Sequence, residues 1–219
     1  MSARNKHYHT QAEVAADILL DTISLDAPWP TSWEDTPKRF GEAWKFWTSG
    51  YAQDPAAELK VFEEEGVGDG MIFQGSIPFF SLCQHHLVPF FGICHIGYIP
   101  HVEKEVVESR LGPLLSGRMT SSIVGLSKLP RLVEIFARRL QVQERATCQI
   151  ADAFMEHVNP QGCGVVMRAR HLCVESRGVQ KIGTNTTTSA LRGLFLNDPE
   201  VRAEFFNFVA TADAGVKSL

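Results

Sequence analysis

The chain has 219 residues, of which 44% are hydrophobic and 21% are charged, close to the averages for globular proteins. With 14 Phe, 4 Trp and only 11 Pro, the composition excludes a disordered or fibrous protein. The formal net charge of -4, with a pI of about 6.1, excludes a global positive field for a nucleic-acid partner. Any anionic ligand must therefore meet a local basic cluster.

Five dispersed cysteines and a polar N-terminus without an apolar signal region favour a reducing, cytoplasmic location. Residues 70–102 contain no Asp, Glu, Lys or Arg, so they must be tested as a membrane span. Pro78, Pro89 and Pro100 would interrupt a helix there, and several histidines would be costly in lipid. We therefore expect no membrane partner, and predict that this segment is buried and forms a site.

The first predicted elements are two helices. Thr10 and Glu13 form a capping box for a helix over about 11–25, and Thr36-Pro37 opens a second helix that Gly50 closes. Residues 71–99 then alternate short apolar runs with Gly and Pro, which is typical of strands joined by tight loops.

The C-terminal half is predicted to be mainly helical. Ser127 starts a long helical stretch with a break near 140–142 and an end near 159–162. Residues 165–174 are predicted to form a strand, and Asp198-Pro199 to start a last helix.

The order of helices, strands, helices, strand and helix favours one α+β fold over a doubly wound α/β fold. We divide it into an N-terminal helical extension, residues 1–60, and a catalytic domain, residues 61–219. Residues 101–124 have a small helical pattern and are interpreted as an inserted surface connection.

No zinc-protease, P-loop or nucleophile-elbow signature occurs, and there is no C-x-x-C. What remains is Cys83-Gln84-His85-His86, in which Cys83 and His86 have the spacing that lets one turn present a thiolate and an imidazole to a metal. The alternative, that both side chains are simply buried, stays open at this point.

The strand predicted over residues 165–174 strengthens the metal hypothesis. Its period of two would place His171 and Cys173 on one face. Cys83, His86 and Cys173 would then supply three ligands and leave a fourth position open, which is typical of catalytic zinc. His85 and His171 would remain free for acid/base work.

A second candidate site is the start of the helix at Ser127. Lys128 and Arg131 lie in its first turn, where cations are unfavourable unless an anion binds there. Arg177 and Lys181 could complete a phosphate cluster. The alternative is that Lys128 and Arg131 are solvated side chains on an exposed turn.

Several ordered motifs resemble those of the GTP cyclohydrolase I family. They are Ser81 to Gly92, Gly97 to Pro100, Gly125 to Ile135, Arg139 to Arg145, His171-Leu-Cys173 and Arg177 to Gln180, with weaker matches at Thr36 to Arg39 and Asp198 to Phe205. The resemblance covers most of the chain from about Thr10.

The resemblance implies the tunnelling fold, an antiparallel sheet with a helix pair on one face. It also implies zinc-dependent hydrolysis of GTP at C8 to formate and 7,8-dihydroneopterin triphosphate, the first step of pterin or folate-type biosynthesis. The expected assembly is a homo-oligomeric ring, a decamer, with sites between subunits. Carried over by position, the metal ligands are Cys83, His86 and Cys173, the catalytic residues are His85, His171 and Ser127, and the substrate contacts are Lys128, Arg131, Gln143, Glu144, Arg177 and Arg39.

Two departures from the family pattern stand out. Gln84 replaces the usual Glu, which should alter the basicity of His85 or the metal affinity. The connection 101–124 is much longer than expected. Two alternatives are a non-catalytic purine-binding protein with a structural zinc and a sister enzyme acting on a pterin or deazaguanine base. Neither needs the whole set of histidines and phosphate-binding cations.

Overall fold

The structure, a computed structural model, describes residues 9–23, 33–66, 68–109 and 112–215, with only the backbone described for the parts of 104–118 in these ranges. The chain divides into two compact units, Met1–Ser49 and Gly50–Leu219. The predicted division at residue 60 into an extension and a catalytic domain stays a prediction. Across the described ranges, no helix has the length and apolar character needed to cross a bilayer.

The first unit contains the two predicted helices, α1 (Gln11–Asp21) and α2 (Thr36–Trp47). Half of the predicted capping box at α1 is present, because the Thr10 hydroxyl accepts from the Glu13 N–H at 3.3 Å. The Glu13 carboxylate accepts from the His9 N–H, one residue before the N-cap, at 2.9 Å. The last two residues predicted for the first helix lie outside the described residues.

The second unit is built on a five-stranded sheet in the order β6-β2-β3-β7-β8. Its strands are β2 (Ile72–Cys83), β3 (Pro89–Ile99), β6 (Leu140–Gln141), β7 (Gly162–His171) and β8 (Asn185–Gly193). All neighbours are antiparallel except β6, which runs parallel to β2. The predicted break near 140–142 is therefore the short strand β6.

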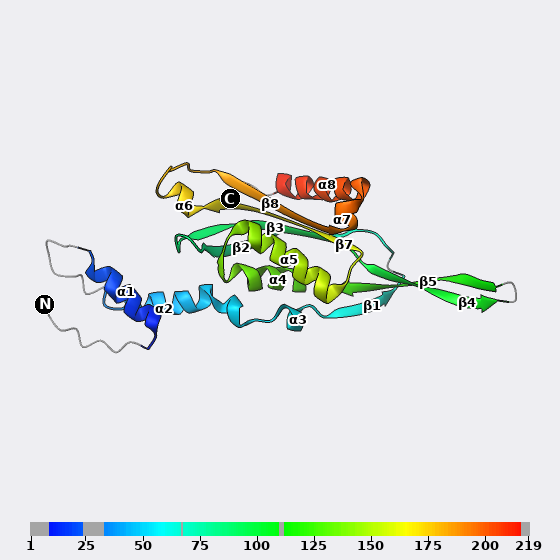
Figure 1. Cartoon of the computed structure of the whole chain (residues 1–219), viewed down its shortest axis with the longest axis horizontal. Coiled ribbons are helices and arrows are strands. Elements are labelled where there is room, and N and C mark those ends of the chain that lie inside the picture. Colours follow the sequence, from blue (N-terminus) through cyan, green and yellow to red (C-terminus); the bar gives the residue numbers. More distant parts are fainter. Residues whose placement is uncertain (1–8, 24–32, 67, 110–111, 216–219) are drawn as a thin grey trace. The chain divides into compact units, whose positions relative to one another are not determined.

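Helices cover both faces of this sheet (Figure 1). On one face lie α4 (Lys128–Ala137) and α5 (Gln143–Val158), whose fully buried Leu132, Ile135, Ile150 and Phe154 pack on Cys94, Ile96 and Met167. On the other face lies α8 (Pro199–Gly215), whose Phe205 and Val209 pack against Ile99 and Val166. The α+β class and the helix pair on one face are confirmed, and α8 adds a second layer.

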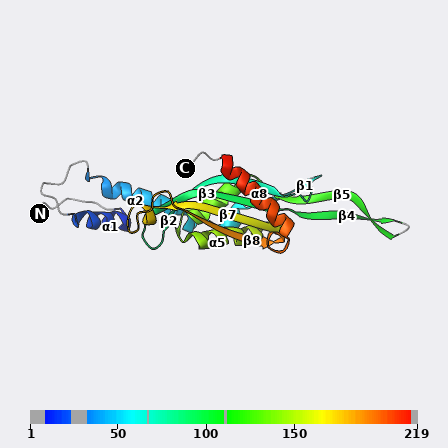
Figure 2. The same ribbon diagram turned by 90° about the horizontal axis from the view of Figure 1, so that it is seen from above.

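The described residues of the predicted connection, 101–109 and 112–124, form two strands, so the helical pattern predicted there is wrong. β4 (His101–Ser109) pairs antiparallel with β5 (Gly112–Val124), and β5 pairs with β1 (Val61–Glu65) in a separate three-stranded sheet. Figure 2 shows β4 and β5 as a long two-stranded arm. The segment contains several β-branched residues, which favour strands. Hydrogen bonding between its two halves stabilises strands more than a few apolar residues at helical spacing can stabilise a helix.

The sequence pattern did not predict β8, which follows residue 184 and begins with a run of threonines. The strand lies at the edge of the sheet and most of its side chains are exposed or half-buried, so it lacks the apolar alternation of a core strand. The remaining short helices of the described residues are α3 (Pro55–Glu58), α6 (Leu172–Glu175), α7 (Leu194–Asn197) and the 3-10 helix η2 (Ser49–Ala52).

Candidate active site

Three potential metal ligands converge where β2 ends. Cys83 is the last residue of β2, His86 lies in the following turn, and Cys173 lies in α6. Their ligand atoms all lie within 4.8 Å of one another, and Cys83 Sγ is 3.5 Å from His86 Nδ1. In the part of the chain that the structure describes, this is the one such group of three or more His, Cys or acidic residues.

The turn itself explains this convergence. The Cys83 carbonyl accepts from the backbone N–H of His86 at 3.2 Å and of Leu87 at 2.8 Å, and Leu87 adopts a φ of 55°. This tight turn brings the imidazole three residues after the cysteine back beside its sulfur.

Cys173 reaches the cluster differently from what we predicted. β7 ends at His171, and Cys173 lies in the one-turn helix α6, so the two side chains do not share a strand face. Arg170 and Glu175 hold this turn with two hydrogen bonds of 2.8 and 2.6 Å. Sequence analysis missed this pair, for which the spacing of five residues is a weak signal.

The donor set fits a divalent metal. Burial, and then the facing Cys83 thiol, raise the pKa of the Cys173 thiol, so the two sulfurs disfavour each other's ionisation. A cation among them would favour the thiolates, and two thiolates with one imidazole are the ligands that zinc prefers.

His171 lies beside the cluster in a fixed orientation. Its ring stacks on Phe90 with centroids 4.6 Å apart, and its Nε2 is 2.7 Å from Gln143 Oε1. Burial lowers the pKa of His171, while the Glu144 carboxylate acts in the opposite direction. Glu144 therefore lies close enough to influence this imidazole.

Gln143 and Glu144 open α5 but differ in burial. Gln143 is buried, and its amide nitrogen donates to the carbonyls of Met167 and Thr186 and to the Thr188 hydroxyl. Glu144 is exposed in the first turn of the helix. Of the two, only Glu144 has a side chain exposed to a ligand from solution.

His85 is exposed in the turn that carries His86. Its Nε2 is 3.1 Å from the amide nitrogen of Gln84, and the Gln84 oxygen accepts from Arg145 at 2.6 Å. Gln84 stands out in the sequence but Arg145 does not, because no local pattern pairs residues that are 61 positions apart.

Lys128 and Arg131 lie at the opposite end of α4 from the thiols. α4 starts just after β5, where the Val124 N–H donates to the Tyr98 hydroxyl near the end of β3. After α4 the chain enters β6, which pairs with Cys83. Ten helical residues rise ~15 Å, and about 9 Å of this rise lies between Arg131 and Ala137, so α4 separates both cations from β6.

Both cations contact Glu58 of α3. Glu58 Oε2 lies 3.4 Å from Lys128 Nζ and 3.3 Å from Arg131 Nη1. The hydrogen bond from Arg131 is the largest influence on the pKa of Glu58 and lowers it; burial acts in the opposite direction, and Lys128 lowers the pKa further. Ser127 is the N-cap residue of α4 without a side-chain capping hydrogen bond. The cations thus already hold a carboxylate where we predicted phosphate.

The remaining predicted contacts are dispersed. Arg177 is exposed after α6, and its charge opposes a small part of the rise in the pKa of the Cys173 thiol, so it lies near the cluster. Arg39 belongs to the first unit, where it forms an exposed ion pair with Asp35 at 3.2 Å.

Comparisons with known proteins identify a family for most of the chain. A family model described as GTP cyclohydrolase I matches residues 12–109 and 118–210. GTP cyclohydrolase 1 of Campylobacter lari is 49% identical over 177 residues, covering 81% of this chain and 83% of the relative. GTP cyclohydrolase 1 of Janthinobacterium sp. (strain Marseille) is 49% identical over 181 residues, covering 82% and 81%. Among solved structures, the archaeosine synthase QueF-Like in the apo form covers 58% of this chain and 97% of its own, at 13% identity and a TM-score of 0.40.

Proposed function

The chain belongs to the GTP cyclohydrolase I family, and we propose that Cys83, His86 and Cys173 form the centre of its active site. Its activity is that of the family: hydrolysis of GTP to formate and 7,8-dihydroneopterin triphosphate, on the tunnelling fold. The observation that carries the site assignment is the convergence of three ligand atoms within 4.8 Å, in segments that also contain His85 and His171.

Zinc is the metal that this donor set favours, with Cys83, His86 and Cys173 as its ligands. When bound, it supplies Lewis-acid chemistry that makes hydroxide available near neutral pH. All five cysteines are free thiols, which suits a reducing cytoplasm.

The two histidines would move the protons of the reaction. We assign His171 to the purine, where N7 gains a proton as water adds to C8 and the imidazole ring opens. We assign His85 to the opening of the ribose ring and the rearrangement that follows. The stacking of His171 on Phe90 supports its role, because a fixed ring can transfer a proton in one direction.

Glu144 is the proposed guanine contact. A carboxylate can accept from both N1–H and the 2-amino group of guanine, and adenine lacks this pair of donors. Exposure at the start of α5, next to His171, supports this role. The Gln143 amide is already hydrogen-bonded within the protein, which supports an indirect role at the guanine end of the site: Gln143 orients His171.

The phosphate contacts support a site shared between copies of the chain. Arg177 lies near Cys173, whereas Lys128 and Arg131 lie in the first turns of α4, toward the end of the helix away from β6. We propose that a neighbouring subunit of a decameric ring brings its own Lys128, Arg131 and Ser127 to this cluster, with Arg39 as a further phosphate contact. The triphosphate would then replace Glu58 as the anion beside these cations.

Incubation of the purified protein with GTP tests the function directly. We expect formate and a product that gives neopterin fluorescence after oxidation. Binding of GTP without either product would favour a purine-binding protein with a structural zinc. Turnover of a pterin or deazaguanine base in preference to GTP would favour a sister enzyme.

A further inference from the structure

We propose that two glutamines, Gln84 and Gln143, hold the two site histidines in opposite neutral tautomers. His85 carries its proton on Nδ1, and His171 carries its proton on Nε2. We assign the two tautomers from the hydrogen-bond partners of the Gln84 and Gln143 side-chain amides. The consequence for catalysis rests on the proposed function.

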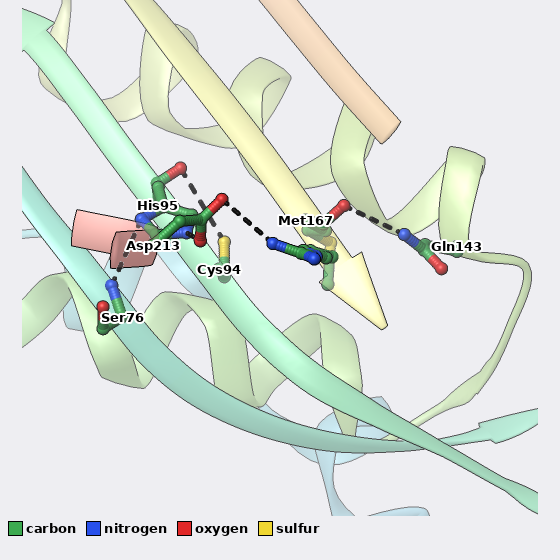
Figure 3. Close-up of polar contacts among 7 residues, drawn as sticks. Ser76, Cys94, His95, Gln143, Met167 and Asp213 are labelled. Atoms are coloured by element: carbon green, nitrogen blue, oxygen red, sulfur yellow. Dashed lines mark hydrogen bonds and ion pairs between the residues drawn. The ribbon is translucent and has the colours of Figure 1, made fainter. Parts of the chain in front are cut away.

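The orientation of the Gln143 amide is determined by its partners. One nitrogen donates to the Met167 and Thr186 carbonyls at 3.0 Å each, and carbonyl oxygens only accept (Figure 3 shows the contact with Met167). The amide oxygen must therefore be the atom 2.7 Å from His171 Nε2. Because an oxygen of this kind only accepts, His171 Nε2 carries a proton.

The Gln84 amide is oriented by a partner of the opposite kind. Arg145 Nη2 lies 2.6 Å from the Gln84 oxygen, and a guanidinium group only donates. The Gln84 nitrogen must therefore face His85 Nε2 at 3.1 Å as a donor. In the neutral ring, this leaves His85 Nε2 as the acceptor and places the proton on Nδ1.

Arg145 is itself held by the interior of the protein. Its Nε donates to the Gln141 oxygen at 3.1 Å, and its Nη2 also donates to the Leu140 carbonyl at 3.0 Å. Gln141 is buried, and its nitrogen donates to the Phe136 carbonyl at 2.9 Å. The exposed His85 is thus oriented by a chain of hydrogen bonds that begins in the core.

The two histidines consequently start the reaction with different capacities. Neutral His171 offers Nδ1 as an acceptor, so it takes the proton lost by the water that adds to C8 before it protonates N7. The new C8–O bond replaces the π bond between C8 and N7, and the proton passes from water to N7 through this ring. Neutral His85 offers Nδ1–H as a donor for the ribose ring oxygen.

The residue at position 84 determines which ring nitrogen of His85 carries the proton, and so makes its tautomer differ from that of His171. A carboxylate there would only accept, so His85 would place its proton on Nε2 and lose the Nδ1 donor. Gln84 is a positioning residue in this scheme, because it acts through His85 and Arg145 keeps its amide from turning.

Solid-state NMR of the sedimented, zinc-loaded protein with ¹⁵N-labelled histidine tests the proposal, at a pH where both rings are neutral. Each ring nitrogen reports whether it carries a proton, and His85→Ala and His171→Ala assign the signals. We expect the Nδ1–H form for His85 and the Nε2–H form for His171. In Gln84→Glu, His85 should change to the Nε2–H form while His171 stays unchanged.

Gln53→Glu is the matched control, because it makes the same substitution at an exposed residue outside the cluster. The proposal is overturned if His85 in the parent carries its proton on Nε2, or if Gln84→Glu leaves its tautomer unchanged. GTP turnover of the same samples separates the two hypotheses. If both histidines show the expected tautomers but the protein releases no formate from GTP, the proposed function is refuted and the tautomer proposal stands.

Discussion

Gly97 on β3 lies directly opposite Gly164 on β7, and both approach the ring of Phe205 from α8. A Cβ atom would lie 2.8 Å from this ring at Gly97 and 2.7 Å at Gly164. The pair of glycines therefore makes the recess in the sheet that lets α8 pack closely.

Replacing Gly164 with Ala should lower the free energy of unfolding by about 1 to 3 kcal/mol, because the added methyl group overpacks a fully buried site. Denaturant titration measures this change. Gly70→Ala is the control, since a Cβ atom there meets nothing within 4 Å. Equal stability of the two variants would mean that α8 does not depend on the recess.

His95 should make stability dependent on pH. It is fully buried on β3, where its Nδ1 accepts from the Ser76 N–H at 3.2 Å and its Nε2 lies 3.2 Å from Asp213 (Figure 3). Asp213 also pairs with Arg168. Burial lowers the pKa of His95 below its ordinary value of 6.5, and the Asp213 carboxylate offsets only part of this shift. The unfolded chain therefore binds this proton more readily than the folded chain.

Its contribution to stability should accordingly be complete above about pH 6.5 and decline as the pH falls toward the folded pKa. Urea titrations at several pH values measure the slope. The His95→Gln side chain keeps a donor and an acceptor but cannot titrate. The variant should therefore be less stable than the parent at high pH, and its free energy of unfolding should change less as the pH falls. Parallel curves for the two proteins would contradict this assignment.

Cys173→Ser should lose zinc and GTP turnover together, because an alcohol replaces the soft thiolate that completes the site. Metal analysis and the formate assay are made on the same preparation. Cys148→Ser, at an exposed cysteine on α5, is the control. Full turnover by a metal-free Cys173→Ser protein would rule out a catalytic zinc.

Glu144→Gln should weaken GTP binding by about 1.5 to 3 kcal/mol, because the guanine donors lose a charged acceptor. Zinc content should stay unchanged. Glu156→Gln, an exposed carboxylate on the same helix, provides the comparison. Binding is measured by calorimetry, and an undiminished affinity for GTP in Glu144→Gln would show that another group recognises the base.

Local sequence patterns predicted the helix start and the tight turn that neighbouring residues determine. They failed where the structure depends on pairing between segments far apart in the sequence. The box at Thr10 predicts α1, and the C-x-x-H spacing of Cys83 and His86 predicts one turn of the metal cluster. The position of Cys173 depends on the end of β7 at His171, which apolar alternation did not reveal. The partner of Gln84 was hidden for the same reason, since Arg145 reaches it through the fold.

The arm formed by β4 and β5 was the largest error of this kind, and its structure sharpens the prediction about its role. Thr120 to Val124 of β5 pair with β1, so this part belongs to the body of the second unit. Beyond the pair of Lys104 and Met119, the described residues of the two strands pair only with each other. The family match also omits residues 110–117.

We therefore expect the outer part of the arm to be dispensable for chemistry. Replacing residues 105–118 by Asn-Gly keeps the pair of Lys104 and Met119 and closes it with a two-residue turn that suits the twist of the strands. Because a short loop replaces a longer one between ends already paired, the entropic cost of closure does not rise. The shortened protein should bind zinc and convert GTP within about twofold of the parent. Size-exclusion chromatography beside the formate assay checks this: an intact assembly without turnover would show that the arm contributes to the active site.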